Sequence, residues 1–143
     1  AFEMEDSEVV YPRIVIMDEA LETHKNDKSL WNEGHQYSDE KGFLDKWLRR
    51  DGAGPYYLDY LRASYLEFDD PDLHWPTFLD EHKALIEKGL KAKLSARVKR
   101  KYAWLREYHN EVVGEALHRI KPDAFSEDFE RPVTDILGDL LID

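Results

Sequence analysis

A short run of β-branched residues between polar segments marks the first third of the chain. Residues 9–16 read VVYPRIVI, and consecutive β-branched side chains beside a proline predict a buried strand over Tyr11 to Ile16. Asp18 then stands where an N-cap would begin a helix that ends near Asn26. Residues 27–42 mix glycine, asparagine, serine and charged side chains, so this segment is predicted to be a loop.

Two apolar runs follow, Phe43 to Arg49 and Pro55 to Leu61, and the turn-rich residues 51–54 (DGAG) separate them. A spacer of this kind between two aromatic runs favours a β-hairpin over Phe43 to Leu61. A helix is the alternative for the first run, because its apolar residues also have helical spacing.

The second half of the chain shows the periodicity of amphipathic helices. Pro71 is expected to force a break, after which a helix begins at Thr77 and is weakened or ended by Gly89. A longer helix follows, so that an antiparallel pair is predicted over Thr77 to Ile120. The apolar residues of the longer helix that share one narrow sector are Leu94, Val98, Leu105, Val112 and Ala116. We expect Val98, Leu105 and Val112 to be largely buried.

The chain ends in a short apolar segment that follows Pro132. Its large aliphatic residues are Ile136, Leu137, Leu140, Leu141 and Ile142. Burying such a side chain is worth roughly 1.5–3 kcal/mol, whereas an exposed apolar cluster promotes aggregation. We therefore expect this tail to form a short amphipathic helix that docks on this chain, on a second copy, or on a part of the protein that precedes Ala1.

Composition and charge limit the class of partner. The chain has 143 residues, of which 42% are apolar, and its formal net charge is −11. A field of this sign repels polyanions, so we expect no specific nucleic-acid partner and no membrane partner. Cysteine is absent, which excludes disulfides and thiolate catalysis and fits a cytoplasmic location. No apolar run approaches the roughly 20 residues of a membrane-spanning helix.

Candidate chemistry is sparse. The six histidines include no His-x-x-x-His pair, and the acidic segment 67–72 lacks the glycine and terminal glutamate of a calcium loop, so no metal site is predicted. The sequence also lacks a recognisable hydrolase triad and a glycine-rich phosphate loop. No catalytic residue is assigned.

One charge pattern departs from the acidic background. From Lys88 to Arg106, eight lysines and arginines occur without an acidic residue among them. A solvated helix face that complements the acidic body is one interpretation. Binding of a phosphate, a nucleic acid or an acidic partner is the alternative, and Arg97, Arg100 and Lys101 are then the candidate contacts.

Four segments of the chain match known motifs. Ala1-Phe2-Glu3-Met4-Glu5 is similar to a helix end A-x-x-L-E, and residues 10–16 are similar to a Y-P-R-I-V strand that follows it. Residues 51–61 are similar to a D-x-G-x-Y-F-x-D-Y-L hairpin, and residues 98–110 are similar to a helix pattern V-x-x-K-Y-x-W-L-x-x-Y-H-N. In these segments the chain resembles bacterial class III nucleotide cyclases, including the pyrimidine cyclases of Pycsar antiphage systems.

The resemblance implies that residues 1–62 are the C-terminal part of a cyclase-like α/β domain and that 63–143 form a helical extension. Phe2 and Glu3 would lie near the substrate, although Glu3 replaces the arginine of classical members. The family's metal-binding Asp pair precedes the A-x-x-L-E segment, so the resemblance implies a parent lyase that uses Mg²⁺ or Mn²⁺ and a chain that supplies no cofactor ligand.

The expected architecture is therefore α+β and helix-dominant, with a strand, a hairpin and a long antiparallel helix pair, as part of a class III cyclase-like fold. The first functional hypothesis is the C-terminal scaffold and dimerisation part of a nucleotidyl cyclase. Its parent would be a homodimer that converts a nucleoside triphosphate to a 3′,5′-cyclic nucleotide in antiviral defence. The second hypothesis is a non-catalytic helical module for protein–protein interaction.

Overall fold

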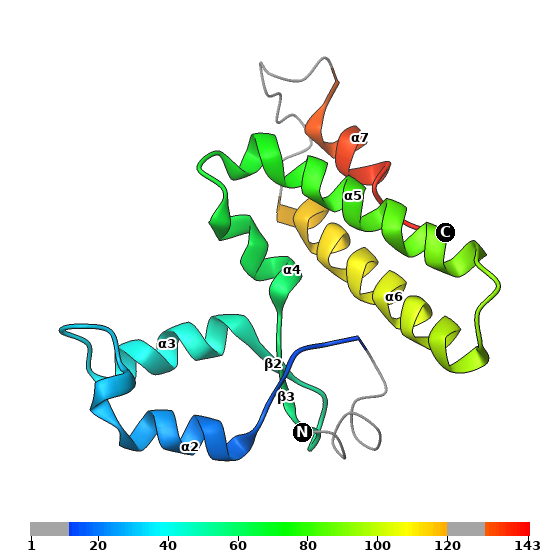
Figure 1. Ribbon diagram of the computed structural model, residues 1–143. Helices are drawn as coiled ribbons and strands as arrows, with labels where there is room; N and C mark the ends of the chain where they lie inside the picture. Colours follow the sequence, from blue (N-terminus) through cyan, green and yellow to red (C-terminus); the bar gives the residue numbers. More distant parts are fainter. Residues whose placement is uncertain (1–11, 120–130) are drawn as a thin grey trace. The chain divides into compact units, whose positions relative to one another are not determined.

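The computed structural model describes residues 12–119 and 131–143, which form mainly helices and one small antiparallel sheet (Figure 1). This agrees with the predicted helix-dominant α+β class. The chain divides into two compact units: unit 1 contains Arg13–Ala63, and unit 2 contains Pro12 and Ser64–Asp143. Within the described ranges, every helix is too short or too polar to span a bilayer.

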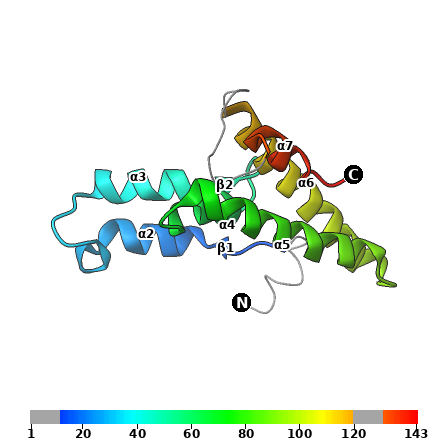
Figure 2. The same ribbon diagram turned by 90° about the horizontal axis from the view of Figure 1, so that it is seen from above.

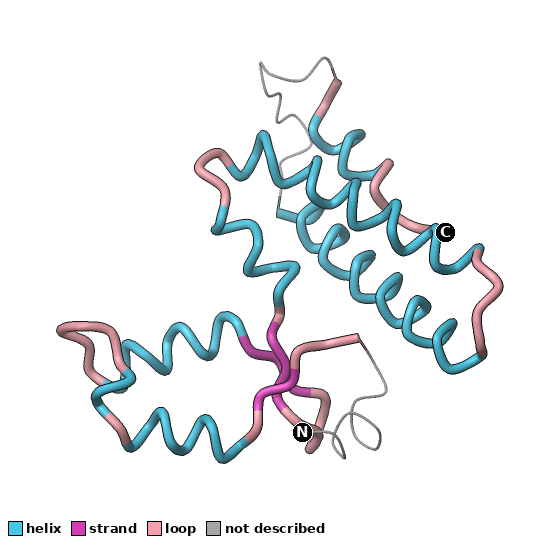
Figure 3. The backbone as a smooth tube through the Cα atoms, in the orientation of Figure 1, coloured by secondary structure: helices cyan, strands magenta, loops and turns pink. Residues whose placement is uncertain are grey.

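Unit 1 contains a three-stranded antiparallel sheet in the order β1-β3-β2. Its strands are drawn in magenta in Figure 3. The strands are β1 (Val15–Ile16), β2 (Leu48–Arg50) and β3 (Tyr56–Leu58), and β3 lies between the other two. Gly52 has a φ of 56° in the turn that joins β2 to β3, a backbone conformation that favours glycine. The turn is closed by a hydrogen bond from the Gly54 N–H to the Asp51 carbonyl at 2.9 Å.

The helices of unit 1 are α2 (Asp18–Asn26), the 3₁₀ turn η1 (Lys28–Leu30), α3 (Tyr37–Trp47) and α4 (Tyr60–Ala63). Helices α2 and α3 run antiparallel, and η1 lies in their connection (Figures 1 and 2). Helix α3 begins because the Asp39 carboxylate accepts the otherwise unpaired N–H of Gln36 at 2.8 Å.

The predictions for unit 1 hold in part. The hairpin is confirmed over residues 48–58, but Phe43 to Trp47 belong to α3, and Tyr60 and Leu61 belong to α4. The predicted loop 27–42 is wrong from Tyr37 onward. Two signals favour a helix in this segment: the capping interaction at residues 36–39 and the helical spacing of its apolar residues. The first strand is much shorter than predicted. Its residues are only half-buried, and Ile14 beside it is 58% exposed. Helix α2 begins and ends close to the predicted residues, with Met17 rather than Asp18 at its N-cap.

Unit 2 consists of η2 (Ser64–Glu67), α5 (Pro71–Lys91), α6 (Ala96–Arg119) and α7 (Val133–Gly138). Helices α5 and α6 run side by side and antiparallel, as predicted, and α7 packs against α6 (Figures 1 and 2). Helix α5 starts six residues earlier than expected. Asp70 caps it by accepting the Leu73 N–H at 3.3 Å, and Pro71 occupies the first helical turn, where a missing N–H costs nothing.

Gly89 has a packing role in α5 and does not end the helix, which continues to Lys91. A methyl group at this position would overlap the ring of Tyr102 on α6. The glycine therefore allows the two long helices to approach each other closely.

Burial along the predicted face of α6 is uneven. Val112 and Ala116 are buried as expected, but Val98 and Leu105 are only half-buried, and Leu94 precedes the helix and is 37% exposed. The remaining buried residues of α6 are Tyr108, His109 and Val113. Burial is thus concentrated in the C-terminal half of α6, where α7 adds a further packing partner.

The expected docking of the C-terminal tail is confirmed within unit 2. Leu137, Leu140 and Ile142 are 2%, 4% and 6% exposed, whereas Leu141 is 40% exposed. The tail packs as a third layer on the α5–α6 pair, and the apolar side chains of the tail are thereby buried.

We predict that Leu79→Ala lowers the free energy of unfolding by about 2–5 kcal/mol, because Leu79 on α5 is fully buried. Leu85→Ala on the same helix is the matched control, since Leu85 is 66% exposed and its truncation should change stability by no more than about 0.5 kcal/mol. Urea denaturation followed by circular dichroism measures both. Equal effects of the two substitutions would contradict the assigned helix face.

Candidate functional site

The carboxylate of Glu40 on α3 takes part in four hydrogen bonds in unit 1. One oxygen accepts bonds from the backbone and side-chain amides of Asn32 at 2.9 and 3.1 Å and contacts His35 Nδ1 at 2.6 Å. The other oxygen lies 3.1 Å from His24 Nε2 on α2. Glu40 thereby joins both helices to their connecting segment, and its side chain is buried.

Hydrogen bonds keep Glu40 ionised. The Asn32 backbone N–H is the largest influence that lowers its pKa to about 2, and the bonds from His35, the Asn32 side chain and His24 add to it against the opposing effect of burial. An ionised carboxylate accepts only, so the two histidines donate to it from the nitrogens named above. These bonds orient both rings, as in a catalytic or metal-binding carboxylate–histidine pair. The same bonds equally serve to hold α2 and α3 together.

An apolar cavity of about 740 Å³ opens beside Glu40 in unit 1. Its lining comes from α2, α3 and the sheet, and the apolar members are Ile16, Leu21, Phe43, Leu44, Trp47, Leu48 and Leu58. Phe43 is 45% exposed, and the Trp47 indole N–H is buried without a hydrogen-bond partner in the structure. A buried unpaired donor and exposed aromatic surface are both unfavourable in an isolated unit.

Asp59 is a second buried carboxylate in unit 1 and lies between β3 and α4. It is fully buried, and its Oδ2 accepts bonds from Arg49 at 2.8 Å and from Arg62 at 2.9 Å. Two guanidinium partners compensate the charge of a carboxylate removed from water. Asp59 therefore fixes the exit from the hairpin into the following helix.

A chain of hydrogen bonds attaches the C-terminal tail to the helix pair in unit 2. His109 Nε2 lies 2.8 Å from the Leu140 carbonyl, and His109 Nδ1 lies 2.9 Å from His82 Nδ1. Because the carbonyl only accepts, His109 donates from Nε2 and accepts at Nδ1, and His82 donates. Asn110 completes the attachment through a 2.8 Å bond from the Ile142 N–H and a 2.7 Å bond to the Ile142 carbonyl.

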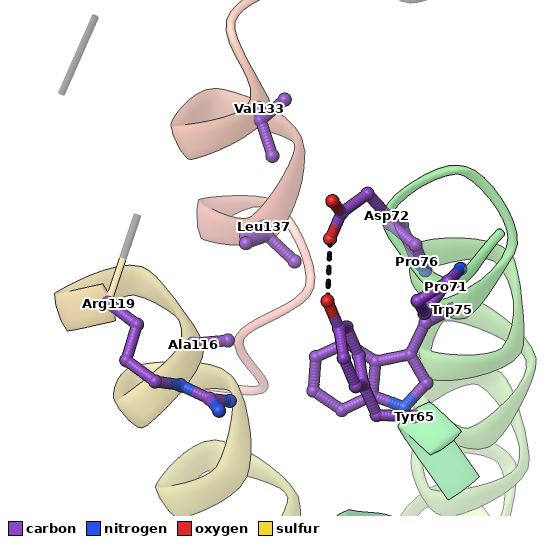
Figure 4. Close-up of a pocket in the computed structure, with 9 residues that line it drawn as sticks. All are labelled: Tyr65, Pro71, Asp72, Trp75, Pro76, Ala116, Arg119, Val133 and Leu137. Carbon is purple, nitrogen blue, oxygen red and sulfur yellow. Dashed lines mark hydrogen bonds between the residues drawn. The ribbon is translucent and has the colours of Figure 1, made fainter. Parts of the chain in front are cut away.

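A smaller cavity of about 250 Å³ lies in unit 2 between α5 and η2 on one side and α6 and α7 on the other (Figure 4). We call it the Tyr65 cavity. Trp75, Ala116 and Leu137 form part of its apolar wall. Its polar groups are the hydroxyl of Tyr65, which donates to Asp72 at 2.9 Å, and the guanidinium of Arg119. This cavity combines apolar walls with a few polar groups, the usual character of a small-molecule site.

The structure places the sequence-predicted contact residues near the start of α6, close to the end of α5. Arg97 and Arg100 are exposed and Lys101 is half-buried. Phe2 and Glu3 lie outside the described residues, as do Tyr11 and Ile120. In residues 12–119 and 131–143, no group of three or more His, Asp or Glu side chains is arranged to hold a metal ion.

Sequence reasoning missed the clusters around Glu40 and Tyr65 because their members carry no motif. His24, His35 and Glu40 meet only after α2 and α3 fold back on each other, and Arg119 reaches the Tyr65 cavity from another helix. Comparison with known proteins adds no further assignment: the chain matches no family model, no curated protein and no solved structure.

We predict that the stability of unit 2 falls between about pH 6.5 and pH 4. Burial, with the neighbouring His109, lowers the pKa of His82 from 6.5 to about 4, and burial also lowers the pKa of His109. The unfolded chain therefore binds protons in this range that the folded chain excludes, and acid favours unfolding. After allowance for the partial exposure of His82, a loss on the order of 1–2 kcal/mol is expected.

The measurement is urea denaturation at pH 7, 6 and 5, with the near-ultraviolet signal as a report of tertiary packing. His82→Gln should flatten the dependence, because it removes one titrating group. His74→Gln is the matched control, since His74 lies exposed on the same helix. A wild-type stability that does not change from pH 7 to pH 5 would contradict the assignment.

Proposed function

We propose that this chain is the C-terminal scaffold and dimerisation part of a nucleotidyl cyclase. The proposal starts from the resemblance of its segments to class III cyclases. Its parent would be a cytoplasmic homodimer that makes a 3′,5′-cyclic nucleotide from a nucleoside triphosphate, as a signal in antiviral defence.

The observation that carries the scaffold role is what the motif residues do in the folded chain. In the hairpin motif, Asp59 is fully buried and bonded to two arginines. In the helix motif, His109 and Asn110 hold the C-terminal tail through its backbone. These contacts serve folding, so both motifs support a structural contribution by this chain to a larger enzyme.

The apolar cavity of unit 1 supports the dimerisation part of the proposal. It exposes aromatic surface at Phe43 and leaves the Trp47 indole N–H without a partner in the structure. A second subunit or another part of the parent that covers this cavity would remove apolar surface from water.

The chemistry of the reaction belongs elsewhere in this proposal. Magnesium or manganese would be held by an Asp pair of the parent, and the described residues include no group arranged for that ion. No catalytic step is therefore assigned to a residue of this chain.

The test is an assay of the full-length parent with each nucleoside triphosphate and Mn²⁺, with product identified by mass spectrometry. We predict that a cyclic nucleotide forms. If none of the triphosphates gives a cyclic product, the cyclase proposal is wrong.

The dimerisation part is tested with Phe43→Asp, which places a charge at an exposed edge of the apolar cavity. We predict that this variant halves the mass measured by light scattering and lowers cyclase activity, while its far-ultraviolet spectrum is retained. Leu66→Asp is the matched control, because Leu66 is 63% exposed and does not line the cavity. An unchanged mass for Phe43→Asp would contradict the dimer surface.

A second candidate function is that of an interaction module, and the basic residues at the α5–α6 connection favour it. We call these residues the basic tip: Lys88, Lys91, Lys93, Lys99, Arg100 and Lys101. Within the described ranges they form no ion pair, although the chain carries a net charge of −11. An acidic protein segment is the partner that such a surface fits, and the negative charge of the whole chain disfavours nucleic acid.

We predict that a fluorescent polyglutamate peptide binds the chain weakly at low salt and is released at high salt, as measured by anisotropy. The variant Lys91→Glu with Arg100→Glu should lose this binding. A single-stranded RNA of mixed sequence should not bind at physiological salt. Equal peptide binding by wild type and variant would rule out the basic tip as the contact surface, and tight RNA binding would replace the acidic partner with nucleic acid.

A further inference from the structure

The Tyr65 cavity of unit 2 has walls that are fixed independently of any ligand. The Trp75 indole is 4% exposed, donates to Ser64 Oγ at 3.0 Å and packs edge-on against Tyr65 with ring centroids 5.2 Å apart. Ala116 and Leu137 are also buried and close the opposite side. A preformed apolar wall of this kind binds without a large cost of ordering.

An acidic group lies at one edge of the cavity. The hydroxyl of Tyr65 donates to one oxygen of Asp72, and burial and this bond both raise the pKa of the phenol, so Tyr65 remains a donor. Among the described residues, the second carboxylate oxygen of Asp72 accepts no hydrogen bond. It is available to a cationic donor of a ligand, and the Tyr65 bond fixes its direction.

A basic group lies on the other side. Arg119 lines the cavity from the end of α6, and its charge acts on Tyr65, since it partly opposes the rise in the phenol pKa. Figure 4 shows its guanidinium on the α6 side of the cavity, across from the Tyr65–Asp72 pair. In the described part of the chain Arg119 forms no hydrogen bond and no ion pair. A guanidinium in this state is suited to bind a carboxylate with two parallel hydrogen bonds.

The two charges together restrict the ligand. A simple anion would be attracted by Arg119 but repelled by Asp72, and a simple cation would meet the reverse combination. A zwitterion with an apolar substituent satisfies both groups and covers the apolar wall. The volume of about 250 Å³ is the space of roughly eight water molecules at ~30 Å³ each, which suits a single amino acid and is smaller than typical sites for drug-sized ligands.

We propose that this cavity binds a free α-amino acid with a large apolar side chain. Arg119 binds its carboxylate, Asp72 binds its ammonium group, and Trp75, Ala116 and Leu137 contact its side chain. The site lies wholly within unit 2, and it does not depend on whether the parent is a cyclase.

The experiment is isothermal titration calorimetry of the full chain at pH 7 with L-phenylalanine and L-leucine. Glycine tests the side-chain contact, N-acetyl-L-phenylalanine lacks the ammonium group, and L-phenylalaninamide lacks the carboxylate. We predict saturable binding of L-phenylalanine or L-leucine, and at least ten-fold weaker binding of glycine and of both blocked compounds.

Two substitutions connect each ligand group to its residue. Arg119→Gln should weaken L-phenylalanine binding at least ten-fold and should abolish the difference between L-phenylalanine and its amide. Asp72→Asn should also weaken L-phenylalanine binding at least ten-fold, and it should abolish the difference between L-phenylalanine and its N-acetyl form. Arg106→Gln is the matched control, because it removes one positive charge from the same helix outside the cavity, and circular dichroism melts verify that each variant folds.

Several results would overturn the proposal. Absence of heat and of any shift in melting temperature with all amino acids up to about 10 mM, a concentration well above the millimolar dissociation constants of weak complexes, would exclude the site. Equal affinity for the blocked compounds would exclude the zwitterion contacts. Full affinity in the folded Arg119→Gln variant would exclude this cavity as the binding place.

Discussion

The hydrogen bond between the buried imidazole of His109 and the Leu140 carbonyl is the constraint on which unit 2 depends. His109 has no exposed surface, and a polar ring in that position destabilises the fold unless both nitrogens have partners. One partner is His82 on α5 and the other is the backbone of the C-terminal tail. The same ring therefore links the two long helices to the tail.

Other contacts of the tail reinforce this arrangement. Asn110 bonds both the N–H and the carbonyl of Ile142, as a neighbouring strand would, and the Lys83 ammonium group donates to the Asp139 and Leu141 carbonyls at 2.8 and 2.9 Å. With its backbone groups satisfied in this way, the tail can bury Leu140 and Ile142 without forming a long helix of its own. The short helix α7 is stable because it is docked.

In unit 1, buried polar groups likewise hold separate segments together, but these groups are carboxylates instead of imidazoles. Glu40 connects α2, α3 and the segment between them, and Asp59 connects the hairpin to α4. Each buried charge is compensated by partners from separate segments, so each selects one arrangement of those segments. These buried polar groups thus act in folding. Arg119 and the second oxygen of Asp72, in contrast, remain available at the cavity for which an amino-acid ligand is proposed.

The sequence by itself determined the local elements whose signals lie within a few residues. The DGAG turn specified the hairpin, the periodicity of residues 96–119 specified the long helix, and the five aliphatic residues after Pro132 required that the tail dock. Tertiary structure decided how far along α6 that face is buried, because the C-terminal tail packs on the second half of the helix, around His109 and Ala116, while Val98 and Leu105 are only half-buried. The tertiary structure also brought together the residues of the clusters around Glu40, His109 and Tyr65. These clusters join residues of different helices, such as His82 with His109 and Tyr65 with Leu137, and no local pattern records a contact that exists only after the helices pack.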